Sequence, residues 1–248
     1  MKAIILAAGY ATRMYPLTKN QPKALLPLGG RVIVDYIVQQ LNTLPGLSEI
    51  ILVSNQKFFS QFENWLSTAN KTPTYIQVPI SLLNNGSVSE EDKLGAIGDI
   101  YFALQAKQIA EDVVIMAGDN YLDYPLLEQY EFFQQKQADT LNAMEINDTA
   151  QLQQFAVAQL DEEGRVLTLV EKPMKPLSNT AIFATYFYRA QTLPLFDEYL
   201  NSGQNMDQPG RFPAWLHTRQ PVYAYKMNGT CHDIGTIAAY EALKEKLG

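Results

Sequence analysis

Two cationic side chains stand near the N-terminus, in stretches that are otherwise small or apolar. Arg13 ends the run AAGYATR, and Lys23 lies between two prolines in PKALLP. A turn of small residues after a strand lets backbone N–H groups at Ala8 and Gly9 approach phosphate oxygens. The rigid, proline-flanked segment would hold the Lys23 ammonium group at a fixed place beside them. These residues predict a phosphate-binding loop with two fixed positive charges; the alternative is a plain turn between a strand and a helix.

Two aspartates are placed to hold a divalent cation. Asp119 comes directly after a predicted strand at Val113–Ala117, and Asp233 stands between a strand and the closing helix. In proteins, Mg²⁺ is bound by one or two carboxylates together with phosphate oxygens and water. Asp119 and Asp233 are therefore predicted Mg²⁺ ligands. The alternatives are a turn-forming role for Asp119 and a helix N-cap for Asp233, although Thr236 stands closer to that helix.

These residues need a scaffold, and the first half of the chain alternates between strand and helix patterns. Strands are predicted at Ala3–Ala7, Ile50–Val53, Thr74–Val78 and Val113–Ala117. Helices are predicted around Ile33–Leu44, Phe58–Leu66 and Ile97–Ala106, and the loop Ser81–Lys93 is the longest segment without a pattern. This alternation favours a parallel sheet with crossover helices, where ligands bind beyond the carboxyl ends of the strands.

The second half of the chain has a more antiparallel character. Strands are predicted at Thr140–Ile146, Phe155–Leu160, Val166–Val170, Ala184–Tyr188 and Val222–Lys226, and helices at Leu193–Leu200, Phe212–His217 and Ile237–Leu247. The segment DEEG at residues 161–164 predicts a hairpin turn between two of these strands. We therefore expect one α/β domain over residues 1–248. Its fold would be a Rossmann-like, mixed but mostly parallel sheet flanked by helices, with a smaller antiparallel subsheet.

The N-terminal loop and the Lys23 segment together resemble the signature of sugar-phosphate nucleotidyltransferases, the family that includes glucose-1-phosphate thymidylyltransferase. The motifs LGAIGD at 94–99, GDN at 118–120, EKP at 171–173 and DIGT at 233–236 follow in the order of that family. The resemblance implies Mg²⁺-dependent transfer of a nucleoside monophosphate from dTTP, UTP or CTP to a sugar 1-phosphate. Residues 1–139 would then bind the nucleotide, and residues 140–248 the acceptor substrate.

The resemblance also implies roles for single residues. Gly95, with Ala8 and Gly9, would contact the nucleotide, and Arg13 and Lys23 would be the catalytic cations. The acceptor substrate would be bound by a further set of polar residues: Asp99, Asn120, Glu171 and Lys172. An acid is also favoured in the first turn of a helix, so Asp99 fits both roles equally. For Glu171 and Lys172 the alternative is a surface ion pair.

The sequence departs from the thymidylyltransferase pattern on the side of the acceptor substrate. Ala156 and Ala184 stand where relatives usually have glycine, and Phe183 replaces a threonine. Because the added methyl groups remove space for a ligand, the identity of the acceptor substrate stays open. A second hypothesis is a cytidylyltransferase for phosphocholine or another small phospho-alcohol, whose cation could face Phe183, Tyr186 or Tyr188. A third is a non-catalytic regulatory protein that binds nucleotide sugars.

The composition excludes several other classes of protein. The net charge of −7 lacks the basic field of a nucleic-acid-binding protein, and no apolar run approaches the roughly 20 residues that span a membrane. Cys231 is the only cysteine, which excludes an internal disulfide and favours a reducing, cytoplasmic compartment. We therefore predict a cytoplasmic enzyme that acts on small phosphorylated ligands. A homo-oligomer is compatible with the resemblance, although no residue of the sequence locates an interface.

Overall fold

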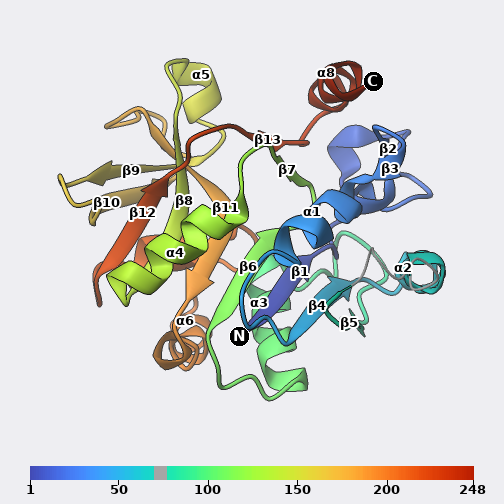
Figure 1. Cartoon of the computed structure of the whole chain (residues 1–248), viewed down its shortest axis with the longest axis horizontal. Coiled ribbons are helices and arrows are strands. Elements are labelled where there is room, and N and C mark those ends of the chain that lie inside the picture. The colour runs from blue at the N-terminus through green and yellow to red at the C-terminus, as the bar shows by residue number, and fades with distance from the viewer. Residues whose placement is uncertain (70–76) are drawn as a thin grey trace.

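Within residues 1–69 and 77–248, which the computed structural model describes, the chain forms a nine-stranded mixed β-sheet (Figure 1). The first half of the chain contributes parallel strands to it: β1 (Lys2–Leu6), β4 (Glu49–Ser54), β5 (Ile80–Asn84) and β6 (Val113–Ala117). They lie in the order β6-β1-β4-β5. This part confirms the predicted parallel sheet.

The second half adds antiparallel strands to the same sheet. The long strand β11 (Thr180–Tyr188) runs antiparallel to β6, β8 (Asp139–Glu145) and β9 (Ala156–Leu160). β9 forms the predicted hairpin with β10 (Val166–Glu171), and β12 (Val222–Lys226) pairs with β8 in parallel. The predicted mixed α/β sheet with a smaller antiparallel part is confirmed.

Helices cover both faces of the sheet because side chains alternate between the two faces of a strand. Ala3 and Ile5 of β1 face one apolar cluster, Ile4 faces the other, and all three are fully buried. The first cluster includes side chains of α1 (Ile33–Leu41), α2 (Phe59–Ala69) and α4 (Leu126–Lys136). The second includes α3 (Ala96–Ala106), α6 (Leu195–Asn201) and α7 (Arg211–Leu216). Burial on both faces explains why β1 is a continuous apolar run.

The order of the strands places a topological switch point beside β1. The chain passes from β1 to β4 and β5 on one side, and then returns to β6 on the other side of β1. In open α/β sheets, ligands bind beyond the carboxyl ends of the strands at such a point. Leu6 ends β1 and Ala117 ends β6, so the residues after these two positions are candidates for binding.

Shorter elements complete the structure. A hairpin with a two-residue loop joins β2 (Pro27–Leu28) to β3 (Arg31–Val32). The strand β7 (Asn120–Leu122) pairs with β13 (Cys231–Asp233). The remaining helices are α5 (Thr149–Leu152), α8 (Ile237–Leu247) and 3₁₀ turns at Thr12–Met14, Lys23–Leu25 and Ala190–Thr192. Figure 1 shows β7 and β13 side by side, next to α8.

Several elements differ from the sequence-based prediction: β11 begins at Thr180 rather than at Ala184, and α5 and the short strands β2, β3, β7 and β13 were not predicted. Of the predicted strand Thr74–Val78, residues 74–76 lie outside the described residues, and the third parallel strand is β5, which begins at Ile80. The start of the predicted loop Ser81–Lys93 therefore belongs to β5. Helix α4 was not predicted, although Leu126 and Phe133 are buried at helical spacing.

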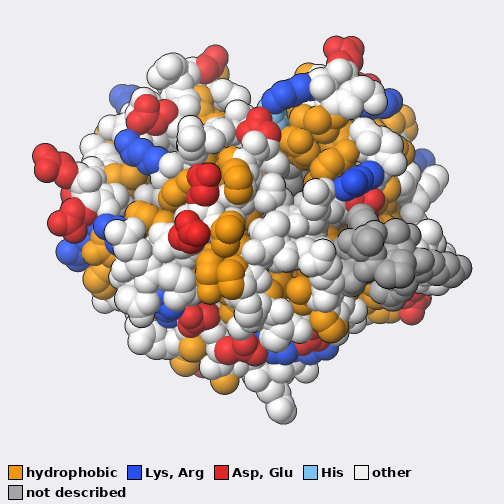
Figure 2. All heavy atoms as spheres, in the orientation of Figure 1, with side chains coloured by type: hydrophobic (Ala, Val, Ile, Leu, Met, Phe, Trp, Pro, Cys, Tyr) orange, Lys and Arg blue, Asp and Glu red, His pale blue; other side chains and the backbone are white. Residues whose placement is uncertain are grey.

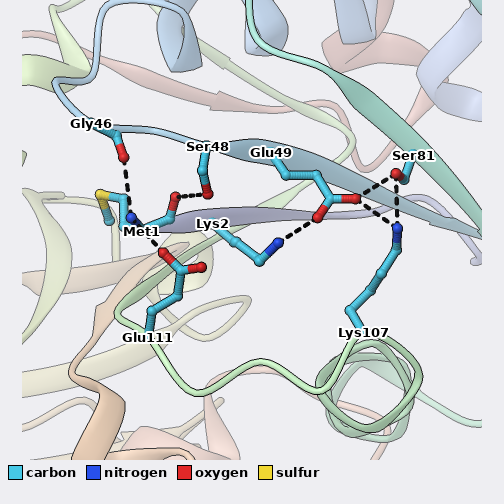
Figure 3. A network of polar contacts seen from close by, with 8 residues as sticks. All are labelled: Met1, Lys2, Gly46, Ser48, Glu49, Ser81, Lys107 and Glu111. Atoms are coloured by element: carbon cyan, nitrogen blue, oxygen red, sulfur yellow. Dashed lines mark hydrogen bonds and ion pairs between the residues drawn. The ribbon is translucent and has the colours of Figure 1, made fainter.

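A network of ion pairs and hydrogen bonds lies at the edge of the sheet where β1 and β4 begin (Figure 3). The Glu49 carboxylate accepts hydrogen bonds from Lys2 (2.6 Å), Lys107 (2.6 Å) and Ser81 (2.5 Å). Burial raises the pKa of Glu49, but these hydrogen bonds outweigh it and lower that pKa to about 2. The network joins β1, β4 and β5 to the residue that follows α3, at the edge opposite the carboxyl ends of the strands.

The surface carries charges of both signs. In Figure 2, Lys and Arg side chains are interspersed with Asp and Glu side chains, and the face shown has no continuous basic area. This pattern agrees with the net charge of −7. Within the described part of the chain, no helix has the length and apolar character needed to cross a membrane.

Candidate active site

A pocket of about 480 Å³ opens at the switch point of the sheet. Leu6 and Ala117 lie at its floor, where β1 and β6 end. The walls come from both halves of the chain. They include the loop after β1, the start of α3, the end of β10, the middle of β11 and the segment Asp207–Gly210. Of the residues predicted to bind the nucleotide, the acceptor substrate or a metal ion, or to act in catalysis, all except Lys23 line this pocket.

Hydrogen bonds from neighbouring segments fix the backbone of the loop after β1. Asn55 donates a hydrogen bond to the Ala8 carbonyl oxygen (2.8 Å), and Thr18 donates one to the Ala11 carbonyl oxygen (2.8 Å). Ala11 has a left-handed backbone, with φ of +50°, a conformation that non-glycine residues seldom adopt. Gly9 is exposed, and a Cβ there would meet no atom within 4 Å. This backbone is therefore accessible from the pocket, as a phosphate-binding loop requires.

Lys23 reaches the end of β6 from its 3₁₀ turn. Its Nζ donates hydrogen bonds to Asp119 Oδ2 (2.5 Å) and to the Ile234 carbonyl oxygen (2.9 Å). Asp119 is positioned by Gly118, whose N–H donates to the Leu6 carbonyl oxygen (2.8 Å). A Cβ at Gly118 would lie only 2.7 Å from that oxygen. Glycine is thus needed there for the turn after β6 to pack against the end of β1.

Asp233 comes to the same place through the short sheet β7–β13. Its antiparallel register sets Asp233 opposite Asn120, the residue after Asp119. The Ile234 N–H also donates to the Asp119 carbonyl oxygen (3.2 Å). The N-cap of α8 is Thr236, whose Oγ1 accepts from the Ala239 N–H, so Asp233 is free of that role. The strand pairing brings the two predicted metal ligands together.

The electrostatics of Asp233 reflect this proximity. Burial and, after it, the charge of Asp119 raise the pKa of Asp233 to about 6, against the opposing effect of Lys23, Arg13 and Lys172. A divalent cation would relieve the repulsion between two such carboxylates. Within the described residues no group of three or more His, Cys, Asp or Glu side chains forms a metal cage. Two carboxylates such as Asp119 and Asp233 fit Mg²⁺, which uses few protein ligands and completes its shell with phosphate and water.

Glu171 and Lys172 end β10 at the far wall of the pocket. Lys172 is exposed and has φ of +48°, and its N–H donates to the Phe155 carbonyl oxygen (3.0 Å). Burial raises the pKa of Glu171, and the charges of Lys172 and Arg211 oppose that rise. A Cβ at Gly210 would lie 2.0 Å from Glu171 Oε2. Gly210 therefore leaves the space that the Glu171 carboxylate occupies.

Aromatic side chains surround this end of the pocket. The rings of Phe155 and Phe183 contact each other at a tilt, with their centroids 4.6 Å apart, and Tyr186 also lines the pocket. Ala156 and Ala184 also line the pocket, so the departures from the family pattern lie where an acceptor substrate would bind. Tyr188 does not line it. Its ring packs against Phe196 and Phe212 in the core, which removes it from the proposed set of ligand-facing aromatic residues.

Gly95, Asp99 and Asn120 line other parts of the pocket. Gly95 has φ of +79°, and a Cβ there would lie 2.7 Å from the Met206 carbonyl oxygen, so glycine is required independently of any ligand. Asn120 is 4% exposed and Asp99 is 6% exposed. Asp99 accepts a hydrogen bond from Asn85, which follows β5 (2.7 Å).

The sequence analysis missed one wall of the pocket. Lys93 forms ion pairs with Glu90 (2.5 Å) and with Asp207 (2.9 Å), which joins the loop before α3 to the segment between α6 and α7. The Met206 and Asp207 carbonyl oxygens accept the N–H groups at the start of α3. The run DQPG at residues 207–210 was a turn signal, but its partner could not be inferred from sequence spacing.

Comparisons with known proteins show the family to which this chain belongs. A family model described as "Nucleotidyl transferase" matches residues 2–248. The chain therefore belongs to the nucleotidyl transferase family. One curated relative is a glucose-1-phosphate thymidylyltransferase of Xanthomonas campestris, which is 27% identical; the match covers 88% of this chain and 76% of the relative. Another is a glucose-1-phosphate adenylyltransferase of Clostridium acetobutylicum, which is 26% identical; the match covers 95% of this chain and 64% of the relative. The chain spans about half to two thirds of the length of most curated relatives it matches.

Solved structures show the same fold. A UDP-glucose pyrophosphorylase in complex with UDP-glucose superposes with a TM-score of 0.83. It is 21% identical, and the match covers 99% of this chain and 97% of that one. At this level of identity the likeness establishes the architecture, including the mixed sheet, and leaves the substrates to be argued from the site.

Proposed function

We propose that this protein transfers a nucleoside monophosphate from an NTP to a sugar 1-phosphate, producing a nucleotide sugar and pyrophosphate. The proposal depends most on one observation, the contact of Lys23 with Asp119 next to Asp233 at the switch point of the sheet. A cation and two carboxylates in one place suit a reaction between two negatively charged phosphates. Membership of the nucleotidyl transferase family supports the same chemistry.

Asp119 and Asp233 are the residues that would hold Mg²⁺. Their carboxylates come from the ends of β6 and β13, and neighbouring cations partly balance their charge. When bound, Mg²⁺ would neutralise charge on the phosphate oxygens of the nucleotide and make its α-phosphorus more electrophilic. The two predicted halves of the chain then both contribute to the centre, because Asp119 belongs to residues 1–139 and Asp233 to residues 140–248.

The reaction needs positioning more than acid–base catalysis. A phosphate monoester has its second pKa near 6, so the attacking oxygen of a sugar 1-phosphate is already largely ionised at neutral pH. Lys172 would hold that phosphate, and Glu171 would accept hydrogen bonds from sugar hydroxyl groups. Attack on the α-phosphorus forms the new P–O bond and breaks the bond to pyrophosphate. Lys23 would stabilise the α-phosphate, and Arg13 the departing pyrophosphate.

Pyrophosphate release measured across a matrix of NTPs and acceptor substrates tests the proposal. With Mg²⁺ present, we expect turnover with at least one sugar 1-phosphate. Turnover with phosphocholine alone would instead support the phospho-alcohol hypothesis, for which Phe155, Phe183 and Tyr186 offer aromatic faces. NTP binding without turnover on any acceptor substrate would contradict the enzymatic function and favour a regulatory binding protein.

A further inference from the structure

The sheet separates the two ends of the candidate active site. Asp119, which follows β6, and its partner Lys23 lie near the middle of the sheet. The strands β5 and β10 stand at the two ends of the strand order β10-β9-β11-β6-β1-β4-β5. Two substrates whose phosphates meet at the centre must extend in opposite directions. With the acceptor substrate at Glu171 and Lys172 after β10, the nucleoside of the NTP would extend towards β5.

A chain of hydrogen bonds lies at the β5 end of the pocket. Tyr10 Oη lies 3.4 Å from Ser87 Oγ, and Ser87 donates to Asn85 Oδ1 through both its N–H (2.9 Å) and its hydroxyl (3.0 Å). Asn85 Nδ2 in turn donates to Asp99 Oδ1 (2.7 Å). Because Ser87 N–H can only donate, it fixes which end of the Asn85 amide faces Asp99. Asp99 is therefore held as a hydrogen-bond acceptor.

Asp99 has capacity for another donor. The side chain lines the pocket and is 6% exposed, yet Asn85 is its one hydrogen-bond partner within the part of the chain that the structure describes. A carboxylate so deeply buried is stabilised by each further donor that reaches it. Burial raises its pKa to about 6, so the group is still largely ionised, and acceptor-only, at pH 7.

The nearby cation is already engaged elsewhere. Lys93 is held between Glu90 and Asp207, and no ion pair joins Asp99 to a cation in the described ranges. Of the three carboxylates that line the pocket here, Glu90 and Asp207 pair with Lys93, and only Asp99 is buried. A ligand that reaches Asp99 must bring its own hydrogen-bond donor, because an unpaired acceptor group there would leave the buried carboxylate unsatisfied.

Resting on the proposed function, we propose that Asp99 recognises the base of the NTP, and that the donor is a nucleotide with an exocyclic amino group, CTP, ATP or GTP, rather than UTP or dTTP. Cytosine, adenine and guanine each offer an amino group to a carboxylate. Uracil and thymine carry a carbonyl oxygen where cytosine has that amino group, and their one ring donor, N3–H, lies between two carbonyl oxygens that a carboxylate repels. This assignment moves Asp99 from the predicted acceptor-binding set to the nucleoside end.

Equilibrium binding of the five NTPs in the presence of Mg²⁺, without any acceptor substrate, tests this inference. We expect at least one of CTP, ATP and GTP to bind about 10- to 100-fold more tightly than UTP and dTTP, the range for one such base contact. Asp99→Asn should remove most of that difference, because an amide can also donate to a carbonyl oxygen. Thermal unfolding shows whether the variant is folded, and Asp197→Asn, at an exposed carboxylate that accepts a hydrogen bond from Tyr101 outside the pocket, is the control that should keep the ranking of the bases.

Tighter binding of UTP or dTTP by the wild type would overturn the inference. So would an unchanged ranking in a folded Asp99→Asn variant, or the absence of binding by every NTP. The readout is separate from that of the proposed function. If amino-bearing NTPs bind preferentially but no acceptor substrate yields pyrophosphate, the enzymatic proposal fails while the base assignment stands.

Discussion

Lys23 Nζ lies 2.5 Å from Asp119 Oδ2, although 96 residues separate them in the sequence. The lysine is held by a 3₁₀ turn that follows Pro22, and the aspartate by the turn after β6. Neither side chain is fully buried, and the pair lies where the phosphates of two substrates would meet. In the free protein, this contact balances the charge of Asp119, and it already holds the Lys23 ammonium group where the proposed reaction would need a cation.

Lys23→Ala should therefore abolish most activity without unfolding the protein. The loss of one positioned charge commonly costs about 10²–10³ in turnover, and we expect a fall in kcat of that size, with a similar fall for Arg13→Ala. Pyrophosphate release gives kcat, and thermal unfolding verifies the fold. Lys19→Ala is the matched control, since Lys19 is exposed and belongs to the same segment. Near-wild-type turnover in Lys23→Ala would contradict the assigned role.

Asp119→Asn should increase the Mg²⁺ concentration that gives half-maximal pyrophosphate release. The amide keeps the size of the side chain but removes the charge that the metal requires. Asp123→Asn is a close control, because both carboxylates have 27% exposed side chains and Asp123 pairs with Lys246 outside the pocket. An identical Mg²⁺ dependence in the wild type and in Asp119→Asn would exclude Asp119 as a ligand.

Much of this site could be predicted because its residues follow strands. Gly9, Asp119 and Glu171 each stand at the carboxyl end of a short apolar run, and such ends meet at one edge of a sheet. The pairing of β7 with β13 could not be predicted, since strands of three residues leave no periodic pattern. The contact of Lys93 with Asp207 was also inaccessible, because sequence spacing does not show which loops meet in the fold.

The helix α4 is a different case, because its signals were present in the sequence. Pro125 stands at its N-cap, and Leu126 and Phe133 fall on one helical face. The pattern is weakened by Glu128 and Gln129, the latter buried through a hydrogen bond to the Thr185 carbonyl oxygen. Because a distant carbonyl group accepts its hydrogen bond, this polar side chain can be buried, and it interrupts the apolar face that a sequence pattern would otherwise reveal.

Gly210→Ala should weaken binding of the acceptor substrate selectively. The new Cβ would stand 2.0 Å from Glu171 Oε2, so the carboxylate has to move from its place in the pocket. The backbone itself is not strained, since Gly210 has φ of −70°. We expect KM for the sugar 1-phosphate to rise several-fold, with little change in NTP affinity. Equal losses of both affinities would show that the segment 207–210 serves the whole pocket rather than the Glu171 end.

Glu49→Gln tests the network at the opposite edge of the sheet through its pH dependence. The folded-state pKa of about 2 lies below the unperturbed value of 4.5, so ionised Glu49 stabilises the fold above pH 4.5, and this contribution decreases as the pH falls towards 2. The shift corresponds to about 3 kcal/mol at neutral pH.

Urea unfolding should show Glu49→Gln destabilised by an amount of that order at pH 7, and by progressively less at pH 4 and below. Glu145→Gln, which removes an exposed ion pair with Lys226, should change stability little at either pH. A pH-independent loss in Glu49→Gln would indicate that packing, rather than the carboxylate charge, accounts for the contribution of Glu49.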